Sequence, residues 1–141
     1  MLTEEDKQRI TGYLGLALGL FVSVQFPATC NEYEVRNGFS RLYYAFFHVS
    51  LAFLLSQGEE IDNYRWYHGD VHSAIGRRMG KYLGKFFREL YGARKEADYE
   101  PAFFSKRYGR DIEKARVDAQ SLLRRANRNF YWIYNESRKV L

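Results

Sequence analysis

Apolar positions along the chain recur at steps of three and four residues, which predicts an all-α fold. The first segment carries four such positions, Ile10, Leu14, Leu18 and Phe21. Thr3 is placed to cap the start of this helix, and the acidic residues 4–6 complement the positive end of the helix dipole. We expect the helix to end before Pro27.

A second helical pattern runs from about Thr29 to Ser56. The letters "TCNE" have the form of a capping box, with Glu32 three residues after Thr29. Gly58 is suited to the position just beyond the helix, where glycine adopts the left-handed conformation. We therefore predict one long helix that is apolar over most of its length.

A third helix is predicted from His68. Its apolar stripe comprises Val71, Ile75, Met79, Tyr82, Phe86 and Leu90. Gly76, Gly80 and Gly84 recur every fourth residue, so one side of this helix is bare backbone. Each glycine costs on the order of 1 kcal/mol relative to alanine. We therefore expect another element to pack closely against that side, followed by a helix end and a loop broken at Pro101.

The fourth helix is predicted from about Arg110. Its apolar stripe comprises Ile112, Ala115, Ala119, Leu122, Ala126, Phe130 and Ile133. Four amphipathic helices in 141 residues predict one domain over 1–141, an antiparallel four- to five-helix bundle. The hydrophobic content of 46% excludes a disordered chain. The single Cys30 excludes an intramolecular disulfide and is interpreted as a small buried hydrophobe.

The N-terminal letters "MLTEEDKQRI" lack the basic region and the apolar run of a signal peptide. The apolar run from Tyr13 to Phe26 is shorter than a membrane span and is interrupted by Gly15 and Gly19. We predict a cytoplasmic protein with no membrane association.

Charge is distributed unevenly along the chain. Residues 1–64 contain eight acidic and four basic residues, whereas residues 65–141 contain nine acidic and 18 basic residues. Such asymmetry is compatible with binding a polyanion such as RNA. The candidate RNA-binding residues are Arg77, Arg78, Lys81, Arg124 and Arg125. Solvated helix faces explain the same pattern equally well.

Polar residues also form a ribbon along the apolar second helix. At about 100° per residue, five side chains fall near one line of the helix: Glu34, Asn37, Arg41, Tyr44 and His48. Beside them run the small residues Gly38, Ala45 and Ala52, again seven apart. A polar ribbon beside small residues favours a cleft between two closely packed helices.

The chemistry of Arg41 and His48 is specific enough to name a reaction. An imidazole titrates near neutral pH and can move a proton, and a guanidinium offers a planar fork of donors to phosphate oxygens. Without a metal, this pair suits RNA cleavage, with His48 as base or acid, Arg41 stabilising charge on phosphorus, and Asn37 and Tyr44 orienting them. The structural alternative pairs Arg41 with Glu34 or another carboxylate and makes His48 a core residue.

Metal and cofactor sites have weaker signals. His68 and His72 lie four residues apart, but no third ligand accompanies them at a recognisable spacing. The glycines 76, 80 and 84 follow no predicted strand and lack the spacing of a phosphate-binding loop. We therefore expect neither a metal nor a cofactor.

Three stretches together resemble a known family. "SRLYYAFFHVSLAFLLSQG", the following "HGDVHSAI" and the later "LYGARKEADYE" are similar to HEPN domains (higher eukaryotes and prokaryotes nucleotide-binding). The resemblance is greatest to small stand-alone prokaryotic members, in which a histidine opens the third helix and an R-x-x-x-D-Y segment closes it. Here those positions are His68, Arg94, Asp98 and Tyr99.

The resemblance implies a helical bundle that forms a homodimer and cleaves RNA without metal, through an arginine and histidine separated by four to six residues. Arg41 and His48 have six residues between them. Many relatives are toxins of toxin–antitoxin pairs, and their partner is often a nucleotidyltransferase. Active members often carry a polar residue directly after the arginine, whereas this chain has Leu42. The alternative is therefore a non-catalytic module that binds a nucleotide or a partner nucleotidyltransferase.

Overall fold

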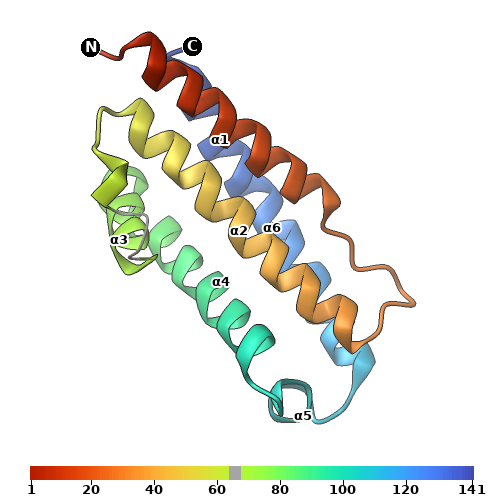
Figure 1. Ribbon diagram of the computed structural model, residues 1–141. Coiled ribbons are helices and arrows are strands. Elements are labelled where there is room, and N and C mark those ends of the chain that lie inside the picture. Colours follow the sequence, from red (N-terminus) through yellow and green to blue (C-terminus); the bar gives the residue numbers. More distant parts are fainter. Residues whose placement is uncertain (64–67) are drawn as a thin grey trace.

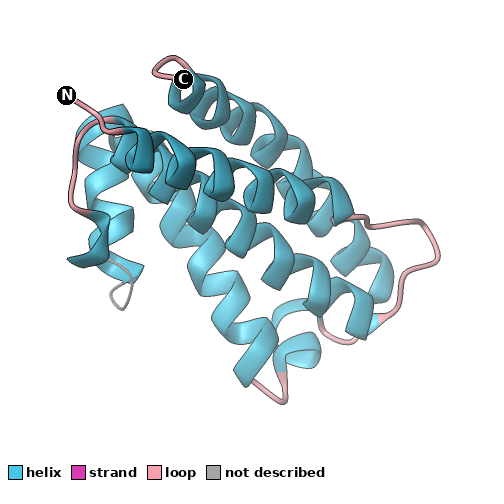
Figure 2. Ribbon diagram, turned by 45° about the horizontal axis from the view of Figure 1, so that its top comes forward, coloured by secondary structure: helices cyan, strands magenta, loops and turns pink. Residues whose placement is uncertain are grey.

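The computed structural model describes residues 1–63 and 68–141. These residues form six α-helices and one short 3-10 turn, and no strand occurs among them (Figures 1 and 2). The elements are α1 (Glu4–Ser23), α2 (Glu32–Ser56), η1 (Ile61–Asn63), α3 (His68–Met79), α4 (Lys81–Tyr99), α5 (Phe103–Tyr108) and α6 (Ile112–Arg138). The predicted all-α class is confirmed, with more helices than the four to five expected.

The four long helices α1, α2, α4 and α6 form an antiparallel bundle in which α2 is central (Figure 1). Helices α1, α4 and α6 each pack against α2, and α3 packs mainly on α4. The two chain ends lie at the same end of the bundle (Figure 1). This arrangement covers α2 on most of its circumference, because three neighbours share its surface.

The helix starts follow local hydrogen-bonding chemistry. Thr3 caps α1 as predicted, in a reciprocal box with Asp6. The predicted box at Thr29 is wrong. Residues 28 and 29 lie in a turn, so α2 begins two residues later, where Asn31 Oδ1 accepts the Glu34 N–H at 2.9 Å and Glu34 accepts from the Asn31 N–H.

The end of α2 is formed as the sequence indicates. Gly58 has a φ of 82°, in the left-handed region. Its N–H donates to the carbonyl of Leu55, and the next N–H, of Glu59, donates to the carbonyl of Leu54. This is the Schellman arrangement, which satisfies carbonyls that the helix itself leaves without partners.

The predicted third helix is broken into α3 and α4 at Gly80, whose φ of 111° is incompatible with a helix. A Cβ on Gly84 would lie 2.8 Å from the Cα of Gly76, so the two helices meet backbone to backbone at these glycines. The expected close neighbour is therefore the other half of the same predicted helix. The break also interrupts the apolar stripe and leaves Tyr82 64% exposed.

The segment after α4 also differs from its predicted form. The residues expected to form a loop around Pro101 contain the short helix α5, whose Phe103 and Tyr108 are buried. Between α2 and α3, residues 61–63 form the 3-10 turn η1, and residues 64–67 lie outside the described part of the chain.

The core follows the predicted stripes closely on α6, where six of the seven positions are buried: Ala115, Ala119, Leu122, Ala126, Phe130 and Ile133. Cys30 is buried, as expected for a small hydrophobe.

Helix α2 is long and apolar enough to cross a membrane by length and composition, but 78% of its apolar 18-residue window is buried in the bundle. Its apolar surface is thus used by its helical neighbours.

The small residues of α2 pack against other parts of the same chain. Ala45 and Ala52 are fully buried, and a Cβ on Gly38 would lie 2.2 Å from Cε1 of Phe26. Ala45 and Ala52 are thus covered by the same chain, whereas Gly38 lines a cavity of about 250 Å³ together with Asn37 and Arg41 of the polar ribbon. The expected cleft between two closely packed helices stays a prediction.

Arg36 fixes α2 relative to the end of α4. Its guanidinium donates to the carbonyl oxygens of Ala97 at 2.8 Å, Glu100 at 3.1 Å and Pro101 at 3.2 Å. These carbonyls belong to the C-terminal end of α4, where the helix leaves acceptors without partners. The contact holds the last turn of α4 beside the first half of α2.

The close approach of α3 and α4 predicts opposite effects for two glycines on α4. Gly84→Ala should lower the free energy of unfolding by roughly 1–3 kcal/mol, because its methyl group meets backbone that cannot move aside. Gly92→Ala has open space around it and should raise stability by up to about 1 kcal/mol. Urea unfolding of both variants measures the difference, and equal stabilities would contradict the packing.

Candidate functional site

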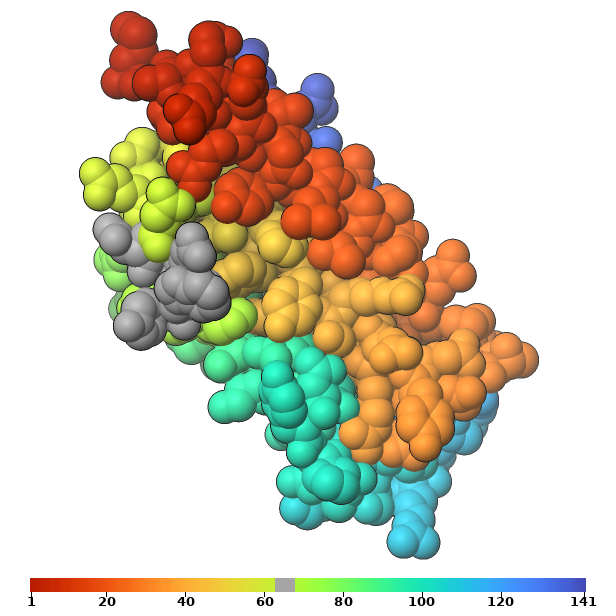
Figure 3. Space-filling model, viewed as in Figure 1, coloured from red at the N-terminus to blue at the C-terminus, as the bar shows by residue number. Residues whose placement is uncertain are grey.

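The polar ribbon of α2 faces outward. We call Glu34, Asn37, Arg41, Tyr44 and His48 the α2 strip. Its first three residues are exposed, and Tyr44 and His48 are half-buried. In the space-filling view, α2 is visible as a band between α1 and α4 (Figure 3). The strip belongs to the surface of α2 that its neighbours leave uncovered, which also includes Tyr33.

Arg41 is the middle residue of the strip and carries a cation without a partner among the described residues. It is exposed and makes no hydrogen bond or ion pair with any described residue. It lines a cavity of about 250 Å³ together with Asn37, Glu34 and the segment that follows α1. Glu34 is engaged in the helix cap with Asn31. The internal Arg41–Glu34 pair of the structural alternative is therefore wrong.

His48 lies against aromatic rings at one end of the strip. Its ring stacks on Tyr13 of α1, with 6.2 Å between centroids and an interplanar angle of 18°, and lies 6.5 Å from the Tyr44 ring. Nδ1 is buried with no hydrogen-bond partner in the described structure. Burial lowers the pKa of His48, so the imidazole is neutral at pH 7.

Arg41 and His48 share a face but are not adjacent. Seven residues of helix separate them by about 10 Å along the axis. Asn37 lies in the cavity beside Arg41, whereas Tyr44 contacts His48. The strip thus places the arginine in its middle and the histidine at one end within one protomer.

A second polar cluster lies beside the strip, centred on Tyr43. The Tyr43 hydroxyl lies 2.5 Å from Nδ1 of His68 and 3.2 Å from Nε2 of His72. A hydroxyl can donate to one imidazole and accept from the other, so it satisfies one nitrogen of each ring. Burial raises the pKa of Tyr43 and lowers that of His68. It also lowers the pKa of His72 to about 4, so all three groups are neutral at pH 7.

Arg94 of α4 connects this cluster to the strip. Arg94 is 4% exposed. Its guanidinium carbon lies 5.1 to 5.7 Å from the ring centroids of four tyrosines: Tyr43, Tyr44, Tyr91 and Tyr99. Its NH1 lies 3.6 Å from Oδ2 of Asp98, which also accepts from the Ser40 hydroxyl at 3.4 Å. Because Tyr44 contacts both Arg94 and His48, the two clusters form one continuous surface.

The structure therefore adds residues that the sequence reasoning did not select. Tyr13, Tyr43 and Tyr91 contact His48, His68 and Arg94 respectively, but the sequence pattern did not mark these tyrosines as site residues. A signal for α4 was present, since Tyr91, Arg94 and Asp98 recur at steps of three and four. No local pattern could place Tyr13 against His48, because that contact joins two helices.

The five candidate RNA-binding residues are spread over the molecule. Arg77, Arg78 and Lys81 lie where α3 meets α4. Arg78 donates to Glu59, and Arg125 makes a two-point contact with Glu89 of α4 at 2.9 and 3.0 Å. Arg124, the neighbour of Arg125 on α6, instead lines a cavity of about 400 Å³ with Phe26. These residues do not form one patch.

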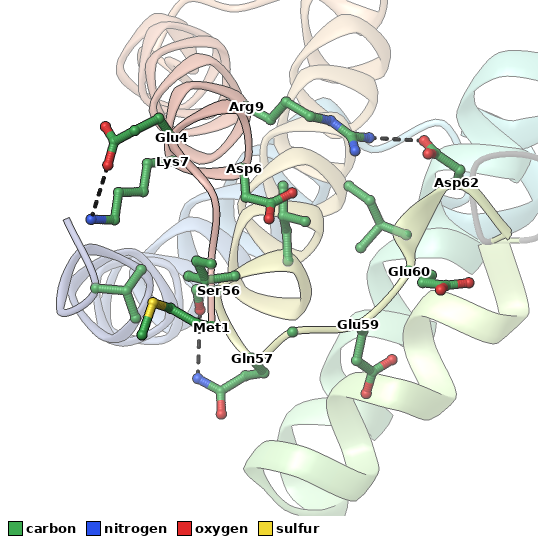
Figure 4. A pocket seen from close by; sticks show the side chains of 15 residues that line it. Met1, Glu4, Asp6, Lys7, Arg9, Ser56, Gln57, Glu59, Glu60 and Asp62 are labelled. Atoms are coloured by element: carbon green, nitrogen blue, oxygen red, sulfur yellow. Dashed lines mark hydrogen bonds and ion pairs between the residues drawn. The ribbon is translucent and has the colours of Figure 1, made fainter.

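A larger cavity than the one beside Arg41 is lined by other residues. It measures about 940 Å³ and lies where the start of α1 meets the end of α2 and η1 (Figure 4). Five carboxylate side chains line it: Glu4, Asp6, Glu59, Glu60 and Asp62. Lys7 and Arg9 are its two basic residues, and they pair with Glu4 and Asp62 respectively. This acidic lining disfavours a polyanion, so the cavity is not a candidate RNA site.

No protein-family model, curated protein or solved structure matches this chain. The assignment of a function therefore depends on the geometry of the α2 strip, the Tyr43 cluster and Arg94, together with the sequence resemblance described above.

The buried histidines predict a loss of stability in mild acid. A histidine whose folded pKa is below its unfolded value of 6.5 contributes stability that is complete above pH 6.5 and falls as pH drops toward the folded pKa. With His72 at a pKa of about 4, its share of the loss between about pH 7.5 and pH 5 is roughly 2 kcal/mol.

Urea unfolding of the wild type and of His72→Gln at the two pH values measures this share. Glutamine does not titrate, so the variant should lose much less stability than the wild type over the same interval. The lower limit stays near pH 5 so that carboxylates with lowered pKa values, such as those of Asp6 and Glu89, remain ionised. Equal losses in both proteins would contradict the neutral, buried state of His72.

Proposed function

We propose that this protein is a metal-independent endoribonuclease of the HEPN type, acting as the toxin of a toxin–antitoxin pair. The observation that carries the proposal is the combination of an exposed Arg41, which has no ion pair among the described residues, and a neutral His48 on the same strip of α2. A neutral imidazole can accept a proton, and an unpaired guanidinium can bind a phosphate without first breaking an ion pair.

The reaction uses the ribose of the RNA as its nucleophile. His48 accepts the proton of a 2′-hydroxyl, and that oxygen attacks the adjacent phosphorus. The bond from phosphorus to the 5′-oxygen breaks, and the leaving oxygen takes up a proton, so the products are a 2′,3′-cyclic phosphate and a 5′-hydroxyl. Arg41 stabilises the charge that develops on the phosphoryl oxygens. Nε2 of His48 is the acting nitrogen, because Nδ1 is buried.

A homodimer would resolve the separation of the two groups. Within one protomer Arg41 and His48 lie about 10 Å apart along the helix. In a two-fold dimer packed on the α2 strip, each Arg41 would approach the partner's His48, because a two-fold interface places the same surface on both sides. Asn37 and Tyr44 would then orient the substrate between the two helices.

Cleavage of RNA in the presence of a chelator tests the proposal. The wild type should yield fragments ending in 2′,3′-cyclic phosphate, and Arg41→Ala should reduce the rate roughly 100-fold or more. His48→Ala should abolish the activity, and His48→Phe, which keeps a ring against Tyr13, should be equally inactive. Fragments are resolved by gel electrophoresis, and their ends are identified by mass spectrometry.

Arg128→Ala is the matched control, because Arg128 is an exposed arginine of α6 without an ion pair among the described residues. Its cleavage rate should be close to that of the wild type. Arg41→Ala should unfold within about 0.5 kcal/mol of the wild type, as expected for an exposed side chain. Undiminished cleavage by both His48 variants would refute the assignment.

Two observations favour a second function, a non-catalytic module that binds a nucleotide or a partner nucleotidyltransferase. Leu42 is fully buried in the core, so the residue after Arg41 does not reach the strip. The buried Nδ1 of His48 also has no hydrogen-bond partner among the described residues that would orient the ring. A base normally has such an orienting partner.

Expression in a bacterial host distinguishes the two functions. If the protein is a toxin, inducing the wild type alone should arrest growth, and inducing His48→Ala at the same protein level should not. The binding module instead predicts normal growth and co-purification with a nucleotidyltransferase or another antitoxin protein. Growth arrest by both the wild type and His48→Ala would contradict an activity that depends on His48.

A further inference from the structure

Arg94 is buried without the hydrogen bonds that a buried arginine normally has. It is 4% exposed, and its Nε is sealed from solvent without a hydrogen-bond partner in the described structure. Its ion pair with Asp98, at 3.6 Å, is longer than a hydrogen bond. Leaving a buried charged donor unsatisfied is unfavourable, so this arrangement calls for an explanation.

The four tyrosines explain how Arg94 is held but not what its donors bind. The rings of Tyr43, Tyr44, Tyr91 and Tyr99 all lie within 6 Å of the guanidinium carbon, in range for cation–π attraction. These contacts stabilise the charge and limit the rotation of the side chain. The side chain is only 5% exposed, and its terminal nitrogens, unlike Nε, are not both buried and without a partner. They are therefore the N–H donors of this fork that a ligand would meet.

The surroundings of this fork match one class of ligand. A planar fork of donors binds phosphate oxygens at two points. Tyr99, next to the fork, is 72% exposed, and an exposed ring is a surface on which a nucleobase can stack. Burial and then the positive charge of Arg94 lower the pKa of His68, so this imidazole is neutral beside the guanidinium. Phosphate and base sites side by side fit one nucleotide of a single strand.

We propose that Arg94 and Tyr99 form a nucleotide subsite for single-stranded RNA, with a phosphate on the Arg94 fork and a base on the Tyr99 ring. The Asp98 carboxylate pairs with the same guanidinium, so a phosphate competes with it for the positive charge. The subsite adjoins the histidine end of the α2 strip through Tyr44. The identity of the polymer as RNA rests on the proposed function, whereas the subsite itself does not require cleavage.

Binding of a fluorescently labelled, fully 2′-O-methylated RNA oligonucleotide tests this subsite. The probe lacks the 2′-hydroxyl nucleophile, so binding is measured on the wild-type protein without any reaction. Tyr99→Ala should weaken binding roughly 5- to 100-fold, since a stacked base is lost. Tyr99→Phe should bind as the wild type does, because it keeps the ring. Tyr82→Ala is the matched control, an exposed tyrosine near the other end of α4.

Two further variants separate a binding role of Arg94 from a structural one. Arg94→Lys keeps the charge but loses the fork and should weaken binding at least fivefold. Asp98→Asn removes the competing carboxylate and should tighten binding severalfold, more than Glu5→Gln, which removes an exposed charge elsewhere. A purely structural Arg94–Asp98 pair predicts no gain in affinity from Asp98→Asn. Thermal unfolding identifies variants that fail to fold, and the Tyr99 variants remain informative if Arg94→Lys is one of them.

The outcomes distinguish this inference from the proposed function. If the wild type cleaves RNA but Tyr99→Ala and Asp98→Asn bind the probe as the wild type does, the subsite is refuted and the ribonuclease stands. If no RNA is cleaved but both variants change affinity as expected, the subsite stands and the ribonuclease fails. If the wild type does not bind the probe at all, the subsite is refuted.

Discussion

Helix α2 must bury apolar side chains on three of its sides, and the other helices are arranged to cover them. Helices α1, α4 and α6 pack around it, and Leu42, Tyr43 and Phe46 are fully buried. Burying such side chains contributes roughly 1.5–3 kcal/mol each, so this packing dominates the stability of the bundle. A helix surrounded by three neighbours keeps one narrow line exposed, and on α2 that line carries Arg41, Tyr44 and His48.

The same constraint explains why polar groups survive in so apolar a segment. Arg41 stays in contact with solvent, so folding imposes no desolvation cost on its charge. His48 is half-buried against Tyr13 and avoids that cost by remaining neutral. His72, which is almost fully buried, is compensated by the Tyr43 hydroxyl. Arg94 is compensated mainly by aromatic faces. Each polar group is thus accommodated in a different way. The way it is accommodated decides whether its donors and acceptors stay available to a ligand.

The surface that results combines two kinds of chemistry. The α2 strip offers a free guanidinium and a neutral imidazole, and the neighbouring part of α4 offers a fixed guanidinium surrounded by tyrosines. A strand of RNA presents phosphates and bases in alternation, and cations beside aromatic rings match that alternation. The large acidic cavity at the other end of the bundle has the opposite charge character. The proposed function and the proposed subsite therefore concern one face of the molecule.

The sequence by itself determined the helices α1, α2 and α6, their apolar stripes and the polar ribbon of α2, because helical periodicity and capping are local properties. The α6 stripe and the Thr3 cap show this. The chain path at Gly80 was decided by tertiary structure, since a break in a glycine-rich helix is favourable only when α3 and α4 pack closely. The partners of Gly38, Tyr13 and Arg94 were also decided there, because each contact joins residues that are distant in sequence. Periodicity gives the direction in which a side chain points, and packing between helices decides what it meets.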